Sequence, residues 1–292
     1  QDYAHEMALE GARLARQCAD ELSTPEKPRF VAGSVGPTNR TLSISPDVSD
    51  PAKRDLTYDE LFNDYCEQID GLIEGGADAI LIETIFDTLN AKAAIDAAMS
   101  ENRRHGTDLP IMVSVSVNDL AGRTLSGQTL EAFLASISSY PIFSVGLNCS
   151  FGALQLKPYV KELGEKAPYY ISVYPNAGLP NELGLYDETA DSMAPEIAEF
   201  IDEGLVNIVG GCCGTTDEFI ARFAELAEGK KPHAVAKPYD HMLLSGLELH
   251  EVVDSASEQV ATFNNVGERC NVAGSRKFLR LINEKKYDEA LS

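Results

Sequence analysis

The sequence predicts an α/β fold of the (β/α)8 barrel class. Short apolar segments without polar alternation, such as residues 79–82, are typical of parallel strands that are buried on both faces. Each of these segments is followed by an amphipathic segment with helical periodicity. Six such strand–helix units after one lone helix correspond to an eightfold barrel without its first strand, first helix and second strand. A doubly wound open sheet is the alternative, but no Gly-x-Gly-x-x-Gly fingerprint follows the first predicted strand.

The elements are expected in a regular order. The lone helix covers residues 3–22. The six units, each given as strand and then helix, are expected at residues 30–35 and 58–74, 79–83 and 87–103, 110–117 and 130–139, 142–148 and 153–166, 169–174 and 191–203, and 205–210 and 216–228. Thr215 and Glu218 predict a capping box at the start of the last helix. Cys18 and Cys66 lie inside predicted helices, so we expect both to be small core residues.

The composition excludes several classes of protein. A net charge of -22 disfavours binding to nucleic acid, which requires clustered Lys and Arg side chains. No apolar segment approaches the roughly 20 residues that cross a bilayer, so no membrane partner is expected. The 6 cysteines are too sparse for the disulfide framework of a small secreted protein. The sequence therefore predicts a cytoplasmic protein with free or metal-bound cysteines.

Three cysteines stand where predicted strands end. Cys149 closes the segment at 146–149, and Cys212 and Cys213 follow two glycines in the segment at 209–216. The carboxyl ends of barrel strands meet at one rim, where the chemistry of such barrels takes place. Because three protein ligands leave one position of a tetrahedral zinc ion open, the triad predicts a catalytic zinc site. Buried core cysteines, a vicinal disulfide or a three-cysteine iron–sulfur site are the alternatives.

These segments also carry a resemblance to a known family. The motifs at 146–149 and 210–216 resemble the homocysteine-binding module of the homocysteine methyltransferases. Across nearly the whole chain the sequence is most similar to the cobalamin-dependent methionine synthases of that family. Further segments that carry this similarity are 36–40, 82–88, 122–128 and 175–180.

The resemblance extends into a second module. Residues 265–275 are similar to the opening strand and loop of the pterin-binding module of methionine synthases, although Cys270 and Ala273 replace the usual threonines. The resemblance implies three regions. They are a partial, zinc-containing homocysteine-binding barrel at 1–236, an interdomain linker at 237–262, and the start of a pterin-binding domain at 263–292.

The resemblance implies a methyltransferase. The homocysteine thiol is expected to fill the open zinc position and, as a thiolate, to attack the methyl group of methylcobalamin, giving methionine. The methyl group comes ultimately from 5-methyltetrahydrofolate. Both cofactors would be bound through modules that are absent or incomplete here, and the expected partners are the pterin-, cobalamin- and activation-type domains of a full-length protein. We do not expect the isolated chain to complete the full reaction.

Further residues are candidates for contact with the substrate. Glu83 matches a family position at the homocysteine pocket, where a carboxylate could bind the substrate ammonium group; a plain rim carboxylate is the alternative. Asn176 matches a position near the metal, or is a turn residue. Ser126 and Gln128 are candidates for contact with the substrate, and a structural role in their loop is the alternative. Asn271 is the candidate for pterin binding, and no protein nucleophile is expected.

Two other functions stay open. One is a stand-alone thiol methyltransferase that uses betaine or a methylsulfonium donor, which the pterin-like segment after residue 264 disfavours. The other is a non-catalytic scaffold stabilised by zinc. A change from three to four sulfur ligands on addition of homocysteine would exclude the scaffold.

Overall fold

The computed structural model describes residues 3–252 and 271–291. The chain divides into two compact units, one that ends at Glu251 and one that begins at Val252. Each unit is described by itself.

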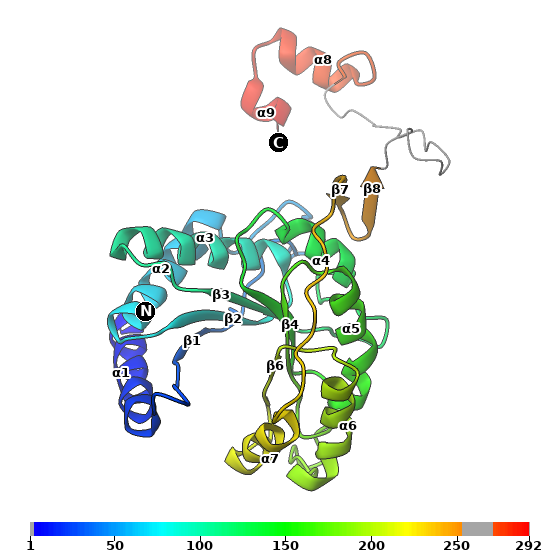
Figure 1. Ribbon diagram of the computed structural model, residues 1–292. Coiled ribbons are helices and arrows are strands. Elements are labelled where there is room, and N and C mark those ends of the chain that lie inside the picture. Colours follow the sequence, from blue (N-terminus) through cyan, green and yellow to red (C-terminus); the bar gives the residue numbers. More distant parts are fainter. Residues whose placement is uncertain (1–2, 253–270, 292) are drawn as a thin grey trace. The chain divides into compact units, whose positions relative to one another are not determined.

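The larger unit is built on one parallel sheet. Its strands are β1 (Ala32–Val35), β2 (Ala79–Ile85), β3 (Ile111–Val115), β4 (Ser144–Asn148), β5 (Tyr170–Tyr174) and β6 (Ile208–Val209). The strands lie side by side in the order in which they occur in the chain. Figure 1 shows a curled sheet with helices along its outer side, an arrangement consistent with a barrel of the TIM type. The predicted α/β class is confirmed.

Helices separate the strands, as the sequence predicts. They are α1 (Ala4–Leu22), α2 (Tyr58–Glu74), α3 (Thr88–His105), α4 (Leu130–Ile137), α5 (Ala153–Lys166), α6 (Ala190–Asp202) and α7 (Asp217–Ala227). Most boundaries lie within two residues of the prediction. The last strand is shorter, because only Ile208–Val209 pair with β5 where residues 205–210 were expected.

Two local predictions are wrong. The N-cap of α7 is Thr216, without a side-chain cap, and no capping box forms from Thr215. The Thr215 hydroxyl instead donates to the Cys212 carbonyl at 2.8 Å, so it stabilises the preceding turn. Cys18 is exposed on α1 rather than buried, whereas Cys66 is partly buried against the core.

One inner row of the sheet has small and polar residues on its three central strands. Register places Ser114 beside Gly146 and Gly146 beside Ser172. A Cβ atom on Gly146 would lie 2.0 Å from the Ser172 carbonyl oxygen, so only glycine fits between these strands. The intervening residues of β4, Val145 and Leu147, are fully buried in the apolar core. This alternation gives β4 one apolar side and one side of small and polar residues.

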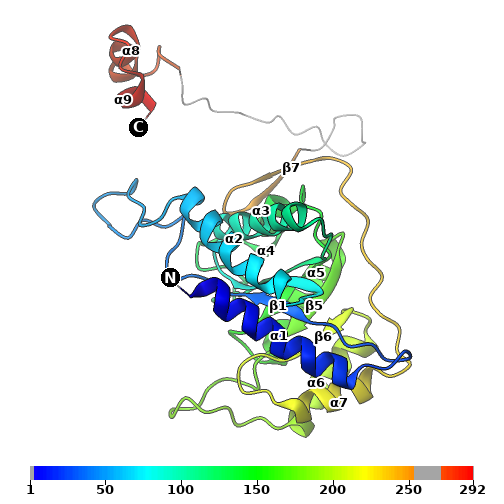
Figure 2. The same ribbon diagram turned by 90° about the vertical axis from the view of Figure 1, so that its left-hand side faces the viewer.

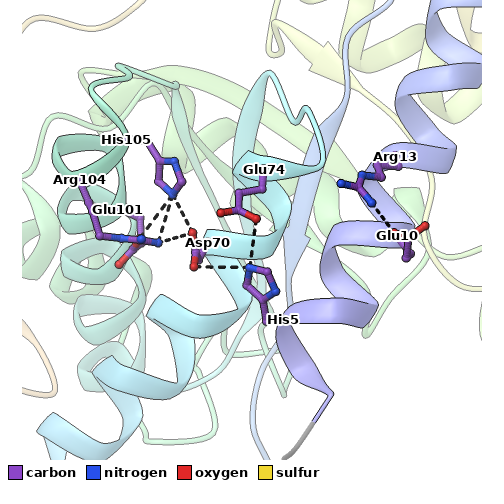
Figure 3. A network of polar contacts seen from close by, with 8 residues as sticks. All are labelled: His5, Glu10, Arg13, Asp70, Glu74, Glu101, Arg104 and His105. Carbon is purple, nitrogen blue, oxygen red and sulfur yellow. Dashed lines mark hydrogen bonds and ion pairs between the residues drawn. The ribbon is translucent and has the colours of Figure 1, made fainter.

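A polar network joins the first three helices (Figure 3). Asp70 of α2 accepts from His105 of α3 at 2.7 Å and pairs with Arg104. His5 of α1 lies 3.5 Å from both Asp70 and Glu74. Arg104 also contacts the buried Glu101 at 2.5 Å. We call these six residues the helix network, and they fix α1 and α3 to α2.

Part of the expected linker is structured. β7 (Met242–Ser245) and β8 (Leu249–Val252) form a hairpin. The Ser245 hydroxyl donates to the Ala132 carbonyl of α4 at 2.6 Å, and the Gln128 amide donates to the Gly246 carbonyl at 2.8 Å. The turn of the hairpin is therefore anchored to the start of α4. Figure 2 shows the segment that leads from α7 to β7.

The smaller unit has α8 (Arg276–Asn283) and α9 (Tyr287–Leu291) among its described residues. The Ser275 hydroxyl caps α8 by accepting from Phe278 N at 3.2 Å. Of the expected start of a pterin-binding module at 263–292, residues 263–270, including Cys270, lie outside the described residues. In the parts of the chain that the structure describes, none of the helices combines the length and apolar character needed to cross a membrane.

Candidate metal centre

Three cysteine side chains meet where the strands end. Cys149 directly follows β4, and Cys212 and Cys213 lie in the turn between β6 and α7. The three sulfur atoms all lie within 4.8 Å of one another. Residues 64 positions apart in the sequence thus converge at the carboxyl ends of parallel strands.

The spacing of the sulfur atoms suits a tetrahedral metal. The Sγ atoms of Cys149 and Cys213 are 3.8 Å apart. With Zn–S bonds near 2.3 Å, tetrahedral geometry separates two sulfur ligands by about 3.8 Å. The donor set and its spacing therefore fit one zinc ion with a fourth position left for another ligand.

The backbone at the end of β5 holds the cysteine segments together. Cys149 N donates to the Tyr174 carbonyl at 3.1 Å, and Cys212 N donates to the Pro175 carbonyl at 2.9 Å. Ala177 N donates to the Cys213 carbonyl at 2.9 Å. Cys149 itself has a φ of 62°, a left-handed conformation that is uncommon outside glycine. Such conformations occur where the surrounding structure imposes them, often at functional sites.

Two glycines make room for aromatic side chains beside the cysteines. A Cβ atom on Gly210 would lie 2.7 Å from the Tyr174 ring, and one on Gly214 would lie 2.5 Å from Tyr186. Gly214 also has a φ of 82°, which glycine adopts most readily. Gly210 and Gly214 are thus explained by close packing on both sides of the cysteine pair.

The contacts between the sulfur atoms shift their pKa values in opposite directions. Hydrogen bonding with the Cys212 thiol lowers the pKa of Cys149 to about 5, against the opposing effect of burial. The same contact, together with burial, raises the pKa of Cys212. These contacts thus favour the thiolate form at Cys149, and thiolates are the form that binds metals.

Asn176 and Glu83 occupy different parts of the rim. Asn176 is buried, and its Oδ1 atom accepts from Cys213 N at 3.1 Å, so it lies against the cysteine turn. Glu83 lies in β2, where it accepts a hydrogen bond from the Ser34 hydroxyl. The adjacent Thr84 contacts Asn148, which in turn contacts Cys212. Glu83 thus stands at the edge of the same polar region.

Ser126 and Gln128 lie in a separate pocket of about 480 Å³. The Ser126 hydroxyl contacts Thr124 at 3.1 Å, and Gln128 contacts Thr88 and the hairpin turn. This pocket includes Lys92 but none of the cysteines. Asn271 is exposed, and its Oδ1 atom accepts from Ala273 N at 2.9 Å.

The sequence reasoning missed three residues around the cysteines. Asn148 precedes Cys149 and is buried, and its amide donates to Thr84 at 2.8 Å and contacts Cys212 Sγ at 3.8 Å. Thr84 has a φ of 58°. Tyr186 packs on Gly214. Asn148 is the last residue of β4 and directly precedes Cys149, so the sequence could have marked it as a neighbour of the site. No sequence pattern marks Tyr186.

Comparisons with known proteins give the family and the fold of the chain. The family model for homocysteine S-methyltransferase matches residues 1–227. The fold is similar to that of the homocysteine methyltransferase MmuM from Escherichia coli. Its apo form gives a TM-score of 0.54 at 21% identity over 75% of this chain and 70% of that chain. The metallated form gives 0.54 at 21% identity over 75% and 67%, and the oxidized form 0.56 at 21% over 74% and 68%. The family match spans more than half of the chain, and on that basis the protein belongs to the homocysteine S-methyltransferase family.

Proposed function

We propose that the cysteine cluster binds zinc and that the chain methylates homocysteine as the homocysteine-binding part of a cobalamin-dependent methionine synthase. One observation carries the metal assignment. Three sulfur atoms lie within 4.8 Å of one another at the strand ends of a protein from a homocysteine methyltransferase family. Three thiolate ligands and one open position are the composition of a catalytic zinc site.

The chemistry follows from the charge of the ligands. When bound, zinc would lower the pKa of an incoming thiol so that it is present as a thiolate at neutral pH. Three cysteinate ligands give the centre a net charge of about -1 and a fourth thiolate about -2, which favours electron density on sulfur. Asn176 and the backbone at 174–177 hold the ligand turns in place. Glu83 is the proposed partner of the substrate ammonium group.

The methyl donor is the finer part of the proposal. We propose methylcobalamin, recharged from 5-methyltetrahydrofolate, because residues 265–275 resemble the start of a pterin-binding module. The proposed regions are the barrel at 1–236, the linker at 237–262 and the pterin-binding start at 263–292, with Asn271 as a pterin contact. A betaine or methylsulfonium donor would fit the same thiol chemistry. It leaves the segment after residue 264 without a function.

X-ray absorption at the zinc edge tests the thiol-binding step. The zinc-loaded chain is expected to show three sulfur ligands alone and four after addition of homocysteine. Methionine, which has the same backbone groups but no thiol, is the matched control and should leave three. An unchanged shell with homocysteine would contradict the proposal and favour a structural zinc site.

The donor is tested separately with the same preparation. Free methylcobalamin, betaine and S-methylmethionine are each supplied with homocysteine, and methionine is measured by mass spectrometry. We expect formation of methionine above the uncatalysed rate with methylcobalamin alone. Turnover with betaine or the methylsulfonium compound instead would keep the family and replace the donor.

A further inference from the structure

The β7–β8 hairpin is a small element that is not part of the barrel sheet. Its two strands form a sheet of their own (Figure 1). Most of their residues are exposed, including Met242 and Leu244. A two-stranded hairpin alone is marginally stable in water. The hairpin therefore depends on its contacts with the rest of the larger unit.

The turn of the hairpin lies on the first turn of α4. The Leu247 carbonyl accepts from the backbone N of Thr129, the N-cap of α4, at 3.0 Å. The Ser245 hydroxyl donates to the Ala132 carbonyl at 2.6 Å and accepts from the Ser136 hydroxyl at 2.7 Å. Backbone and side chain of the turn thus both hold it on the helix.

The same turn contacts the segment that precedes α4. We call residues 116–129 the β3–α4 loop. The Gln128 amide of this loop donates to the Gly246 carbonyl at 2.8 Å. Arg123 forms an ion pair with Glu248. The hairpin therefore contacts the loop at two separate points.

These two points also close the loop on itself. The Arg123 guanidinium donates to the Gly127 carbonyl at 2.8 Å. The backbone N of Thr124 donates to the Gln128 carbonyl at 3.0 Å. Arg123 and Gln128 thus take part both in the internal bonds of the loop and in its contacts with the hairpin. Loss of the hairpin contacts would remove support from both bonds.

The β3–α4 loop begins beside the cysteine cluster. Ser116 directly follows β3, and its hydroxyl contacts the Ser150 hydroxyl at 2.6 Å. Ser150 follows Cys149, and the two residues have left-handed φ values of 60° and 62°. The loop therefore connects the hairpin with the surroundings of a cysteine ligand.

We propose that the β7–β8 hairpin is a releasable strap that orders the β3–α4 loop, so that the segment leading to the second unit controls the mobility of this part of the barrel rim. β8 ends at Val252, where the second unit begins. A force on the connecting segment therefore acts first on the hairpin. The inference goes beyond the proposed function, because it requires neither zinc nor homocysteine.

The attachment is weak enough to open without unfolding of the barrel. The side chains of Arg123 and Glu248 are 35% and 63% exposed, and solvent screens such a pair. Leu247, the apolar residue of the turn, is 59% exposed. Segments with few buried apolar contacts open locally at a lower free energy than global unfolding requires. The hairpin can thus detach while the sheet and helices stay folded.

Amide hydrogen exchange of Ser245→Ala in the full chain tests the strap. The substitution removes the hydroxyl that joins the hairpin to α4. We expect the amides of Thr124, Gly127 and Thr129 to exchange about tenfold faster, because the lost hydrogen bonds shift the local opening equilibrium. The amide of Cys212, which is bonded to the end of β5, should keep its rate. Mass spectrometry with residue-level fragmentation gives these rates.

Ser138→Ala is the matched control. It removes another serine hydroxyl of the α4 region, which donates to the Ala135 carbonyl at 2.9 Å and does not contact the hairpin. It should leave exchange in the β3–α4 loop unchanged.

Salt gives a second measurement that does not depend on the serine. Added salt screens the pair of Arg123 and Glu248, so exchange in the loop should become faster in the wild type and stay nearly constant in Glu248→Gln. Glu225→Gln is the matched control. It removes the partner of Arg222, which is also an exposed ion pair, and should keep the salt dependence of the wild type.

The outcomes decide between a strap and a passive hairpin. Faster exchange at Thr129 with unchanged rates at Thr124 and Gly127 overturns the inference, because the hairpin would then lie on the loop without ordering it. Equal acceleration throughout the barrel also overturns it, since that result indicates general loss of stability. Unchanged loop exchange in the double variant Ser245→Ala/Glu248→Gln overturns it as well. Zinc stoichiometry of the same samples tests the proposed function separately.

Discussion

The cysteine cluster and the helix network are alike in one respect and opposite in another. Both bring three potential metal ligands within 4.8 Å of one another: Cys149, Cys212 and Cys213 in the first, and His5, Asp70 and Glu74 in the second. In the helix network two of the three carboxylates already have a guanidinium partner, because Arg104 contacts both Asp70 and Glu101. Among the described residues, the printed hydrogen bonds of the cysteine sulfurs join them to the Asn148 amide and to one another.

The difference shows why proximity of ligands alone does not define a metal site. A carboxylate that already has a guanidinium partner gains little from a cation, whereas clustered thiolates without a cationic partner are stabilised by one. The supporting backbone differs as well. The helix network stands on regular helices, while the cysteines stand on strand ends with left-handed residues and close glycine contacts.

The largest expected effect is on zinc affinity, which should differ between variants of the cysteine cluster and of the helix network. Cys212→Ser should lower zinc affinity by about a hundredfold or more, because one of three strong ligands is lost. His5→Ala should leave zinc affinity unchanged, because Asp70 of its cluster already pairs with Arg104. Competition titration with a chromophoric chelator measures both. Equal losses in the two variants would show that the helix network is the zinc site or a second one.

Much of the fold follows from local periodicity. The strand–helix alternation and the strand-end position of the cysteines are set by neighbours in sequence, which is why both can be expected before any coordinates. The prediction that Cys18 is buried was wrong, because helical spacing predicts which residues share a face but not whether another element covers that face. Thr215 fits a capping pattern, yet the adjacent turn uses its hydroxyl instead.

The residues that surround the cysteine cluster were harder to predict from the sequence than the cluster itself. Tyr186 and Gly214 are brought together only by the path of the loop between β5 and α6, and no spacing rule encodes that path. Ser126 and Gln128 lie in a glycine-rich loop as expected. Gln128, however, contacts Thr88 and the β7–β8 hairpin, and both residues line a pocket that contains none of the cysteines. Long-range packing decides such details.

A smaller effect, on the stability of the fold, is expected from the close glycine contact beside the cysteines. Gly214→Ala should destabilise the fold by about 2 kcal/mol, because the new Cβ atom meets a φ of 82° and the Tyr186 side chain at 2.5 Å. Gly184→Ala is the matched control. Its φ of 76° is similar, but nothing lies within 4 Å of the new Cβ atom, so only the strain of about 1 kcal/mol remains. Chemical denaturation of the metal-free variants gives both values, and a lower zinc affinity is expected for Gly214→Ala alone. Equal destabilisation would mean that contact with Tyr186 does not constrain the cysteine turn.

The smallest effect concerns the pH dependence of the helix network. Burial raises the pKa of Asp70, but hydrogen bonds from His105 and Arg104 outweigh burial and lower it overall. A carboxyl group with a lowered pKa in the folded state contributes stability above its unfolded pKa of about 3.9, and that stability is lost as pH falls through the folded value.

Asp70→Asn should therefore cost about 1 kcal/mol at pH 7, a modest value because Arg104 is 52% exposed and solvent screens the pair. The gap between wild type and variant, measured by urea unfolding, should narrow as the pH falls below about 4, while zinc affinity at pH 7 stays the same. A gap that does not change with pH would show that shape rather than charge fixes α1 and α3 to α2. The pairing of Asp70 with Arg104 would then not distinguish the helix network from the cysteine cluster.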